Sequence, residues 1–298
     1  MHVSLSATAY AKLNLALHVT GQRADGYHLL DSLVVFTRYG DALSVTAAAE
    51  DSFTLSGIYA NQVPVTGDNL VLKARDVLRA HYPDLSSAVA IHLEKNLPVA
   101  SGIGGGSSDA ATVLVLLMRL WKISAESADL NRLCLALGAD VPMCMHGQIY
   151  SGGVIAKGIG EDLQHVQNLP ELPLVLINDM TALSTPQIFK NLHKRDNPPL
   201  PKLPGLTTIS DLCDYLTSTR NDLYAPAASL APQLPRILNI LDDSGAKFTQ
   251  MSGSGATCLG IYDTIAQAQH AAAQLRHNYP HWFIQATSTV TASALPQL

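Results

Sequence analysis

The sequence PVASGIGGGSSDAA at residues 98–111 has four glycines within five positions, followed at once by a long apolar stretch. Glycine lets the backbone adopt positive φ and approach a ligand closely. A helix after such a loop offers unpaired N–H groups and the positive end of its dipole. Because four glycines exceed what a helix cap needs, the stretch predicts a loop and helix start that bind a phosphate. The alternative is a plain glycine-rich turn in which serine or aspartate caps the helix.

Two other phosphate-binding motifs do not fit this stretch. A Walker A loop needs a lysine followed by serine or threonine after its glycines, and this loop has no lysine. The dinucleotide-binding fingerprint needs glycine at the last position of GxGxxG, where Ser107 stands. If the stretch binds a phosphate, it therefore does so as a loop of another kind.

Composition narrows the class of protein. A length of 298 residues gives a prior of about two domains. Charged residues make up 14% of the chain, and the net charge of −5 is dispersed, whereas a nucleic-acid binder would carry a basic face. No apolar run approaches the roughly 18 residues of a membrane helix, and the N-terminus lacks a signal-peptide pattern. We therefore expect neither a nucleic-acid nor a membrane partner.

The cysteines and histidines predict no structural metal site. The four cysteines form no CxxC pair, which favours reduced, mostly buried thiols in a cytoplasmic protein. The eleven histidines show no HExxH or other ligand spacing, which argues against structural zinc.

Periodicity in the first half predicts strands and helices without a repeating order. Alternation indicates a strand at residues 9–19, whose less apolar face carries Lys12, Asn14, Ala16 and His18. An Asp-Gly turn follows at residues 24–26. Beyond it we expect a helix capped by Asp68, a strand at residues 89–93, and two helices, the first ending near Trp121 and the second at Leu137.

The second half continues this mixture, so the sequence favours an α+β fold over a doubly wound sheet. The proline-rich residues 193–204 predict a surface loop. A weaker break near residue 163 divides the chain into expected domains at residues 1–163 and 164–298. The remaining predictions are strands at residues 174–177, 246–251 and 258–262, and helices at residues 231–242 and 265–279.

Three further stretches have the residue types of a phosphoryl-transfer site. Asp140, in LGADVP, could orient or deprotonate an attacking hydroxyl, although a lone aspartate there is more often a turn residue or cap. Lys12 could stabilise the charge of a phosphoryl group during its transfer, or it could be a solvated lysine on a strand. The MSGSGAT loop at residues 251–257 suits either phosphate binding or a tight turn. In DGYH, at residues 25–28, the last two residues could stack on and hydrogen-bond a flat base, or they could simply flank a hairpin turn.

Taken together, these stretches resemble the GHMP kinase superfamily, whose central motif is a proline, three residues, then Gly-Leu-Gly and serines. The residues that fit it are Pro98, Gly102, Gly104, Ser107 and Ser108, with Ile103 for the usual leucine. Five stretches are typical of fewer members of the superfamily. They are GGGSSDAA, AKLNLALHVTGQRADGYH, LGADVP, NDL at residues 221–223 and MSGSGAT. They resemble one branch of the superfamily over residues 9–262.

The resemblance implies two domains, the first like ribosomal S5 domain 2 and the second ferredoxin-like. It implies transfer of the γ-phosphoryl group of ATP, with Mg²⁺, to the 2-hydroxyl of 4-diphosphocytidyl-2-C-methyl-D-erythritol in the non-mevalonate isoprenoid pathway. We expect a cytoplasmic monomer or weak homodimer whose partners are this small substrate and ATP.

The resemblance also implies roles for single residues, and it assigns none to a metal ion. Lys12 and Asp140 match the catalytic pair. Tyr27 and His28 match residues that stack on and hydrogen-bond the cytosine, and the other substrate-side matches are Asn14, Thr185, Gly253 and Ser254. The ATP-side matches are Lys95, Asn96, Pro98, Gly102, Gly104, Gly105, Gly106, Ser107 and Ser108.

Departures from the family pattern are modest, since Tyr10 replaces a frequent proline and no donor or charged group is lost.

Three rival functions remain open: a superfamily kinase for mevalonate, homoserine or a sugar, an ATP-consuming decarboxylase, and a nucleotide-binding sensor without turnover. DGYH and GGGSSDAA argue against the first, and intact Lys12 and Asp140 argue against the last.

Overall fold

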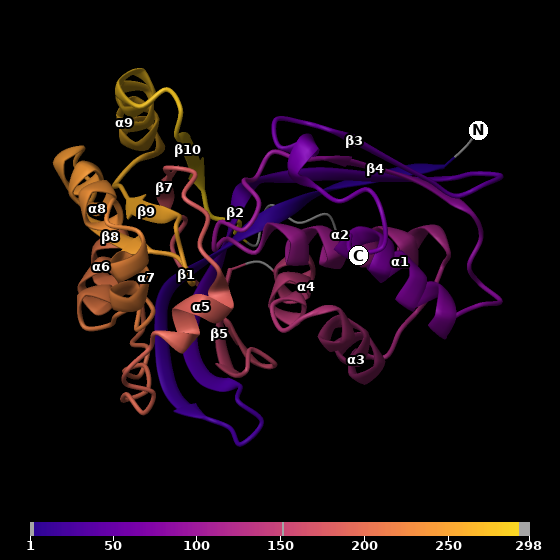
Figure 1. Ribbon diagram of the computed structural model, residues 1–298, viewed down its shortest axis with the longest axis horizontal. Helices are drawn as coiled ribbons and strands as arrows, with labels where there is room; N and C mark the ends of the chain where they lie inside the picture. The colour runs from indigo at the N-terminus through magenta and orange to yellow at the C-terminus, as the bar shows by residue number, and fades with distance from the viewer. Residues whose placement is uncertain (1–2, 151, 292–298) are drawn as a thin grey trace. The chain divides into compact units, whose positions relative to one another are not determined.

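The computed structural model describes residues 3–150 and 152–291, and the chain divides into two compact units (Figure 1). Unit 1 contains the described residues up to Ala11 together with Tyr39–Val99 and Gly104–Ile149. Unit 2 contains Lys12–Arg38, Ala100–Ile103 and the described residues from Tyr150 onward. Neither unit is continuous in sequence. The boundary expected near residue 163, which divides the chain into two continuous segments, stays a prediction.

Two long strands contribute to both units. They are β1 (Ser4–Gln22) and β2 (His28–Ala47), which pair with each other and are joined through the predicted turn at residues 24–26. The other elements of unit 1 are β3 (Ser52–Ser56), η1 (Ala60–Gln62), α1 (Leu70–His81), β4 (Val89–Glu94), α2 (Gly105–Leu120), α3 (Ser127–Leu137) and α4 (Val141–Ile149).

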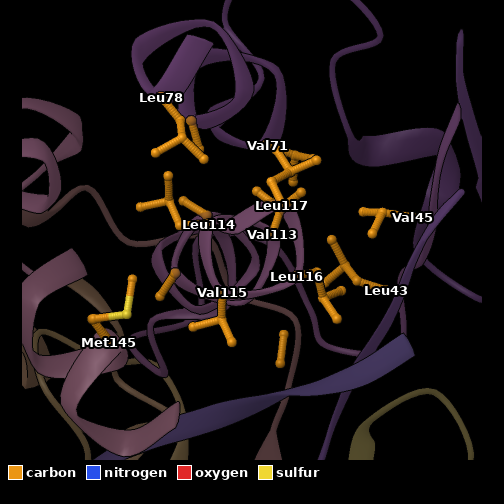
Figure 2. Close-up of a cluster of buried hydrophobic side chains, with 14 of the residues drawn as sticks. Leu43, Val45, Val71, Leu78, Val113, Leu114, Val115, Leu116, Leu117 and Met145 are labelled. Atoms are coloured by element: carbon orange, nitrogen blue, oxygen red, sulfur yellow. The ribbon is translucent and has the colours of Figure 1, made fainter. Parts of the chain in front are cut away.

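The core of unit 1 surrounds α2. Ten successive residues of this helix, from Ser108 to Leu117, are buried, and all but three are apolar. A helix that is apolar on every side must be enclosed. Figure 2 shows this enclosure, with side chains of α1, α4 and β2 around those of α2. The labelled residues are Leu43, Val45, Val71, Leu78, Val113, Leu114, Val115, Leu116, Leu117 and Met145.

Unit 2 contains β5 (Gly153–Gly158) and β6 (Asp162–Val166), which extend the first half of β2 by antiparallel pairing. Its second sheet is antiparallel, in the order β10-β7-β9-β8, and α8 and α9 pack against it (Figure 1). The bounds are β7 (Pro173–Asn178), α5 (Thr185–Lys190), α6 (Ile209–Thr217), α7 (Tyr224–Leu230), α8 (Leu234–Asp243), β8 (Phe248–Met251), β9 (Cys258–Ile261), α9 (Ile265–Asn278) and β10 (Phe283–Ser288).

Most expected elements are confirmed, and the errors lie at their ends. The first helix is capped by Asn69, whose side chain accepts a hydrogen bond from the N–H of Val71 at 2.8 Å, and not by the exposed Asp68. The helix expected at residues 231–242 begins at Leu234 instead. Pro232 and Pro235 explain this start, since proline disfavours helix for the residue before it and suits a first turn.

Residues 193–204 contain no helix or strand, which confirms the predicted loop. Hydrogen bonds to other residues of unit 2 hold the loop in place. The N–H of Asn197 donates to Val19 O at 3.0 Å, and the N–H of Leu200 donates to Asp31 Oδ2 at 3.2 Å. The fully buried His18 lies 3.0 Å from Pro198 O through Nδ1, and its Nε2 accepts from the N–H of Arg220. Nε2 is therefore unprotonated, and the imidazole is neutral.

Two further expectations concern thiols and membranes. All four cysteines are buried, as predicted, and none is in a disulfide in this structure. No helix in the described ranges is both long and apolar enough to cross a membrane.

We expect His18→Asn to weaken the pH dependence of stability. Burial lowers the pKa of His18 below its usual 6.5. Above pH 6.5 the His18 imidazole is neutral in both the folded and the unfolded chain. As the pH falls below 6.5, the unfolded chain gains a proton that the folded chain does not, so the free energy of unfolding drops by at most about 1.4 kcal/mol per pH unit. Asparagine can still donate to Pro198 O but does not titrate.

Urea unfolding at about pH 7.5 and about pH 5.5 measures this difference. The exposed His281→Asn is the matched control and should behave like the unmodified chain. An acid-induced loss of the same size in His18→Asn would contradict the assignment of this effect to His18.

Candidate functional site

The start of α2 has the geometry of an anion-binding helix end. Gly104 caps the helix in the left-handed region, with φ of 65°, and provides no side-chain cap. The first backbone bond of the helix runs from the N–H of Ser108 to Gly104 O at 2.8 Å. The three preceding N–H groups thus have no partner within the helix. No acidic residue lies in this first turn, so the helix dipole is available to an anionic ligand.

The two serines of this turn differ in their surroundings. The Ser108 hydroxyl is buried and donates to Tyr10 O at 2.6 Å, which fastens α2 to β1 inside unit 1. Ser107 is half-buried. Ser107 is therefore the better placed of the two to offer a hydroxyl to a ligand, whereas Ser108 has a structural bond to satisfy.

In unit 2 the two glycine-rich stretches contact each other. A Cβ on Gly102 would lie 2.6 Å from Gly255 O, and one on Gly253 would lie 2.8 Å from Gly102 O. The Ser252 hydroxyl donates to Gly102 O at 3.1 Å, and the N–H of Thr257 donates to Ser101 O at 3.2 Å. Stretches about 150 residues apart thus form one compact glycine cluster, which neither stretch predicts alone.

Lys12 and Asn14 lie in the same part of unit 2, and both are buried. Lys12 Nζ donates to Asn14 Oδ1 at 2.9 Å, and Asn14 Nδ2 donates to Ser32 Oγ at 2.7 Å. The N–H of Asn14 donates to Ser252 Oγ at 3.1 Å. The alternative of a solvated strand lysine is therefore wrong. Thr185 also contacts the second glycine loop, with its hydroxyl 2.8 Å from that of Ser254.

His28 forms half of an aromatic pair in unit 2. Its ring stacks on Phe189 with centroids 4.6 Å apart and planes at 23°. Its Nε2 is buried without a hydrogen-bond partner among the described residues. Burial, assisted by the positive charge of Arg195, lowers the pKa of His28, so the ring is neutral at pH 7. A neutral ring nitrogen next to an aromatic face suits the edge of a flat polar base.

Tyr27 lies beside this pair in sequence and is 57% exposed. Phe189, by contrast, was missed by the sequence reasoning. Its place in STPQIF, four residues after Thr185, was a weak signal, because it does not distinguish a site residue from a core residue.

Lys95 occupies a buried ion cluster in unit 1 that the sequence reasoning also missed. Its Nζ lies 2.5 Å from Asp41 Oδ2 and 2.7 Å from Asp109 Oδ2. The next residue, Asn96, donates its N–H to Asp41 Oδ1 at 2.6 Å. Pro98 follows at the start of the glycine stretch. The Lys95 ammonium is thus engaged by protein carboxylates.

Asp140 lies in the turn between α3 and α4, in unit 1, and is half-buried. Its carbonyl accepts the N–H of Cys144 at 3.1 Å, so the residue opens α4. The N–H of Val141 donates to Gly138 O at 3.1 Å and closes the turn. Its catalytic role stays a prediction, as do the roles of the other matched residues. Within the described ranges, no group of three or more His, Cys, Asp or Glu side chains could hold a metal ion.

We expect Gly102→Ala to destabilise the protein by about 3 kcal/mol or more. Its φ of 77° strains any L side chain, and the added methyl would meet two carbonyl oxygens within 2.7 Å. Gly245→Ala is the matched control, because Gly245 has φ of 92° but open space around its Cβ, so strain alone should cost about 1–2 kcal/mol. Urea unfolding compares the two, and equal losses would contradict the close packing of Gly102.

Comparison with known proteins connects these features to a family. The family models of the GHMP kinases N terminal domain and the GHMP kinases C terminal domain match residues 69–148 and 204–281. The 4-diphosphocytidyl-2-C-methyl-D-erythritol kinase of Brucella abortus biovar 1 (strain 9-941) is 52% identical over 94% of this chain and 93% of its own length. The enzyme of the same name from Chelativorans sp. (strain BNC1) is 49% identical over 99% of both chains.

Solved structures agree with these matches. A crystal structure of 4-(cytidine 5'-diphospho)-2C-methyl-D-erythritol kinase has a TM-score of 0.78 and 29% identity over 96% of this chain and 99% of its own. A homoserine kinase from Cytophaga hutchinsonii has a TM-score of 0.64 at 14% identity over 97% of this chain and 95% of its own, and so shows the fold alone. The expected α+β, two-domain fold is confirmed: the chain belongs to the GHMP kinase family.

Proposed function

We propose that this protein is a kinase that transfers the γ-phosphoryl group of ATP to the 2-hydroxyl of 4-diphosphocytidyl-2-C-methyl-D-erythritol. The products are the 2-phosphate and ADP, in the non-mevalonate route to isoprenoid precursors. The observation that carries the choice within the family is identity near 50%, over nearly the whole chain, to relatives with this name. The sites in each unit support the two halves of the reaction.

The phosphate half is supported by the start of α2. The glycine cap, the three N–H groups without helical partners and the absence of an acidic side chain fit a polyphosphate chain. We assign the ATP phosphates to Gly104, Gly105, Gly106 and Ser107, with Gly102 shaping the entry to the loop. Mg²⁺ bound with ATP would neutralise charge on the transferring phosphoryl group.

The cytidyl half is supported by His28, Phe189 and Tyr27. The His28–Phe189 stack offers an aromatic face, and the unpartnered Nε2 of His28 offers a hydrogen bond to the base edge. Tyr27 is exposed enough to close over the other face of a base. Asn14, Thr185, Gly253 and Ser254, which the contacts in unit 2 bring into one region, are proposed to hold the rest of this substrate.

Phosphoryl transfer needs the hydroxyl in line with the phosphorus and stabilisation of the charge that moves. We propose that Asp140 orients the hydroxyl and accepts its proton as the oxygen attacks. We propose that Lys12 stabilises the charge on the transferring group. Asn14 positions the Lys12 ammonium through their 2.9 Å hydrogen bond, which fixes a side chain that would otherwise have several rotamers.

None of the four buried cysteines is in a disulfide, and such cysteines are typical of reducing compartments. For this reason we place the reaction in the cytoplasm. A monomer or weak homodimer remains our expectation, and light scattering after size exclusion measures it directly.

The decisive assay measures ADP formation from Mg-ATP with 4-diphosphocytidyl-2-C-methyl-D-erythritol, called the cytidyl alcohol below. Mevalonate, homoserine and galactose are tested in parallel. We expect turnover with the cytidyl alcohol alone and no release of carbon dioxide. Turnover with another alcohol would discard the base-pocket assignment. ATP binding without any turnover would favour a nucleotide sensor, and carbon dioxide release would favour a decarboxylase.

We expect Asp140→Asn to lower kcat by about 10²–10⁴-fold with little change in either KM, because general-base catalysis contributes about that much. Saturating steady-state kinetics measures the loss. Asp84→Asn, an exposed aspartate of the same unit, is the control and should keep full activity. Near-full turnover by Asp140→Asn would rule out its role as the base.

We expect Tyr27→Ala and His28→Ala each to raise KM for the cytidyl substrate by about tenfold or more while sparing KM for ATP. The reason is that stacking area and a base-edge hydrogen bond, worth roughly 1–3 kcal/mol, are lost from one substrate only. Tyr150→Ala, at a tyrosine with 53% exposure, is the matched control. Equal increases in both KM values would count against the cytosine pocket.

A further inference from the structure

The buried ion cluster of unit 1 joins three elements. Asp41 lies in β2, Lys95 follows β4, and Asp109 lies in α2. The side chains of these residues are 0%, 3% and 4% exposed, respectively. Burying charges is expensive, and breaking such a cluster leaves an uncompensated charge. A cluster of this kind therefore holds its three elements in one relative position.

The cluster fixes the chain that enters the glycine stretch. While Asp41 Oδ2 contacts Lys95, Asp41 Oδ1 accepts the N–H of Asn96 at 2.6 Å and that of Leu97 at 2.8 Å. The next residue is Pro98, the first of the stretch. The Lys95 backbone is itself held, because its N–H donates to Ser56 O and its carbonyl accepts from the N–H of Tyr59.

The same cluster also fixes the helix that leaves the stretch. Asp109 lies one turn after Gly105, and its bond to Lys95 ties the first turns of α2 to the cluster. A Cβ on Gly105 would lie 3.1 Å from Lys95 Nζ and 3.6 Å from the Leu97 Cβ. Gly105 thus lets the helix start approach the lysine closely.

The charge of the cluster is compatible with a bound anion. Burial, together with the nearby Asp41 carboxylate, raises the pKa of Asp109 to about 8. Asp109 Oδ1 has no hydrogen-bond partner in the described part of the chain. A raised pKa of Asp109 reduces the negative charge of the cluster, so the cluster repels a nearby phosphate less.

We propose that Lys95, Asp41 and Asp109 are positioning residues for the nucleotide phosphates. They clamp both ends of the glycine stretch, residues 95–97 on one side and the first turns of α2 on the other, so that the N–H groups of Gly105 to Ser107 present a fixed site. This inference rests on the proposed function, since it concerns the ATP half of that reaction. The Lys95 ammonium acts through the protein and not by contact with ATP.

The test uses two substitutions at one position. Asp109→Leu removes the tie to α2 and leaves Lys95 and Asp41 as a neutral pair. Asp109→Asn keeps an oxygen that can accept from Lys95 Nζ. We expect Asp109→Leu to raise KM for ATP and the Kd of ADP by about tenfold or more, with KM for the cytidyl substrate within about twofold of the unmodified enzyme. Asp109→Asn should restore both constants to within about threefold.

Thr112→Val is the matched control on the same helix. Thr112 is buried, and its hydroxyl has no partner among the described residues, so its removal should leave nucleotide binding unchanged. Gly105→Ala is a second test, because its methyl would lie 3.1 Å from Lys95 Nζ and press on the ammonium of the cluster. If Asp109→Leu does not fold, Asp109→Ala at the same position decides, and we expect the same selective loss of nucleotide affinity.

Three results would overturn the clamp: unchanged nucleotide affinity in both Asp109→Leu and Gly105→Ala, equal loss for both substrates, or equal loss in Asp109→Leu and Asp109→Asn. ADP binding, measured by calorimetry, needs no turnover. An enzyme that binds ADP but does not phosphorylate the cytidyl alcohol would thus refute the proposed function while the clamp is still tested.

Discussion

An enclosed α-helix can offer its unpaired N–H groups to a ligand only at its exposed end. In unit 1 this constraint governs the arrangement of the surrounding elements. The apolar residues of α2 are covered by α1, α4 and β2 (Figure 2). The glycine-capped start is the end that we propose as the ligand-binding end. The many core residues that enclose α2 therefore decide where the proposed phosphate site lies.

The glycine residues of the stretch serve two different purposes. Gly104 takes a left-handed conformation that begins the helix, and Gly102 allows a close approach to the second glycine loop. Gly105 has ordinary backbone angles, but its missing side chain leaves room for the buried lysine. A motif that looks like a single ligand loop is thus partly a packing motif, and the two roles constrain the same residues.

Local patterns in the sequence predicted only some of the elements, and they missed β2, β3, β5, β6, β10, α4, α5, α6 and α7. The strand at β1, the apolar helix α2 and the turn at residues 24–26 each depend on residues close in sequence. Contacts across long separations were not predictable. The bond from Asn14 to Ser252 joins residues 238 positions apart, and nothing in either local pattern indicates it.

One missed residue had a usable signal. Asp109 lies in a helix that is otherwise almost wholly apolar, and a carboxyl in such a place must have a partner. The sequence thus indicated that a partner exists, but the identity of that partner, Lys95, required the fold. Phe189 is different, because an aromatic residue in a short amphipathic helix fits a core position equally well.

The buried cysteines affect how the protein can be handled. Burial raises the pKa of the Cys134 thiol to about 12 and that of Cys213 to about 11, and it raises that of Cys258 as well. Such thiols present almost no thiolate at neutral pH, which is the form that reacts with oxidants and alkylating reagents. All four thiols are also buried, so we expect the native chain to react only slowly with thiol reagents. A single cysteine introduced on its surface would take up a fluorophore or spin label selectively, with no need to remove the natural four.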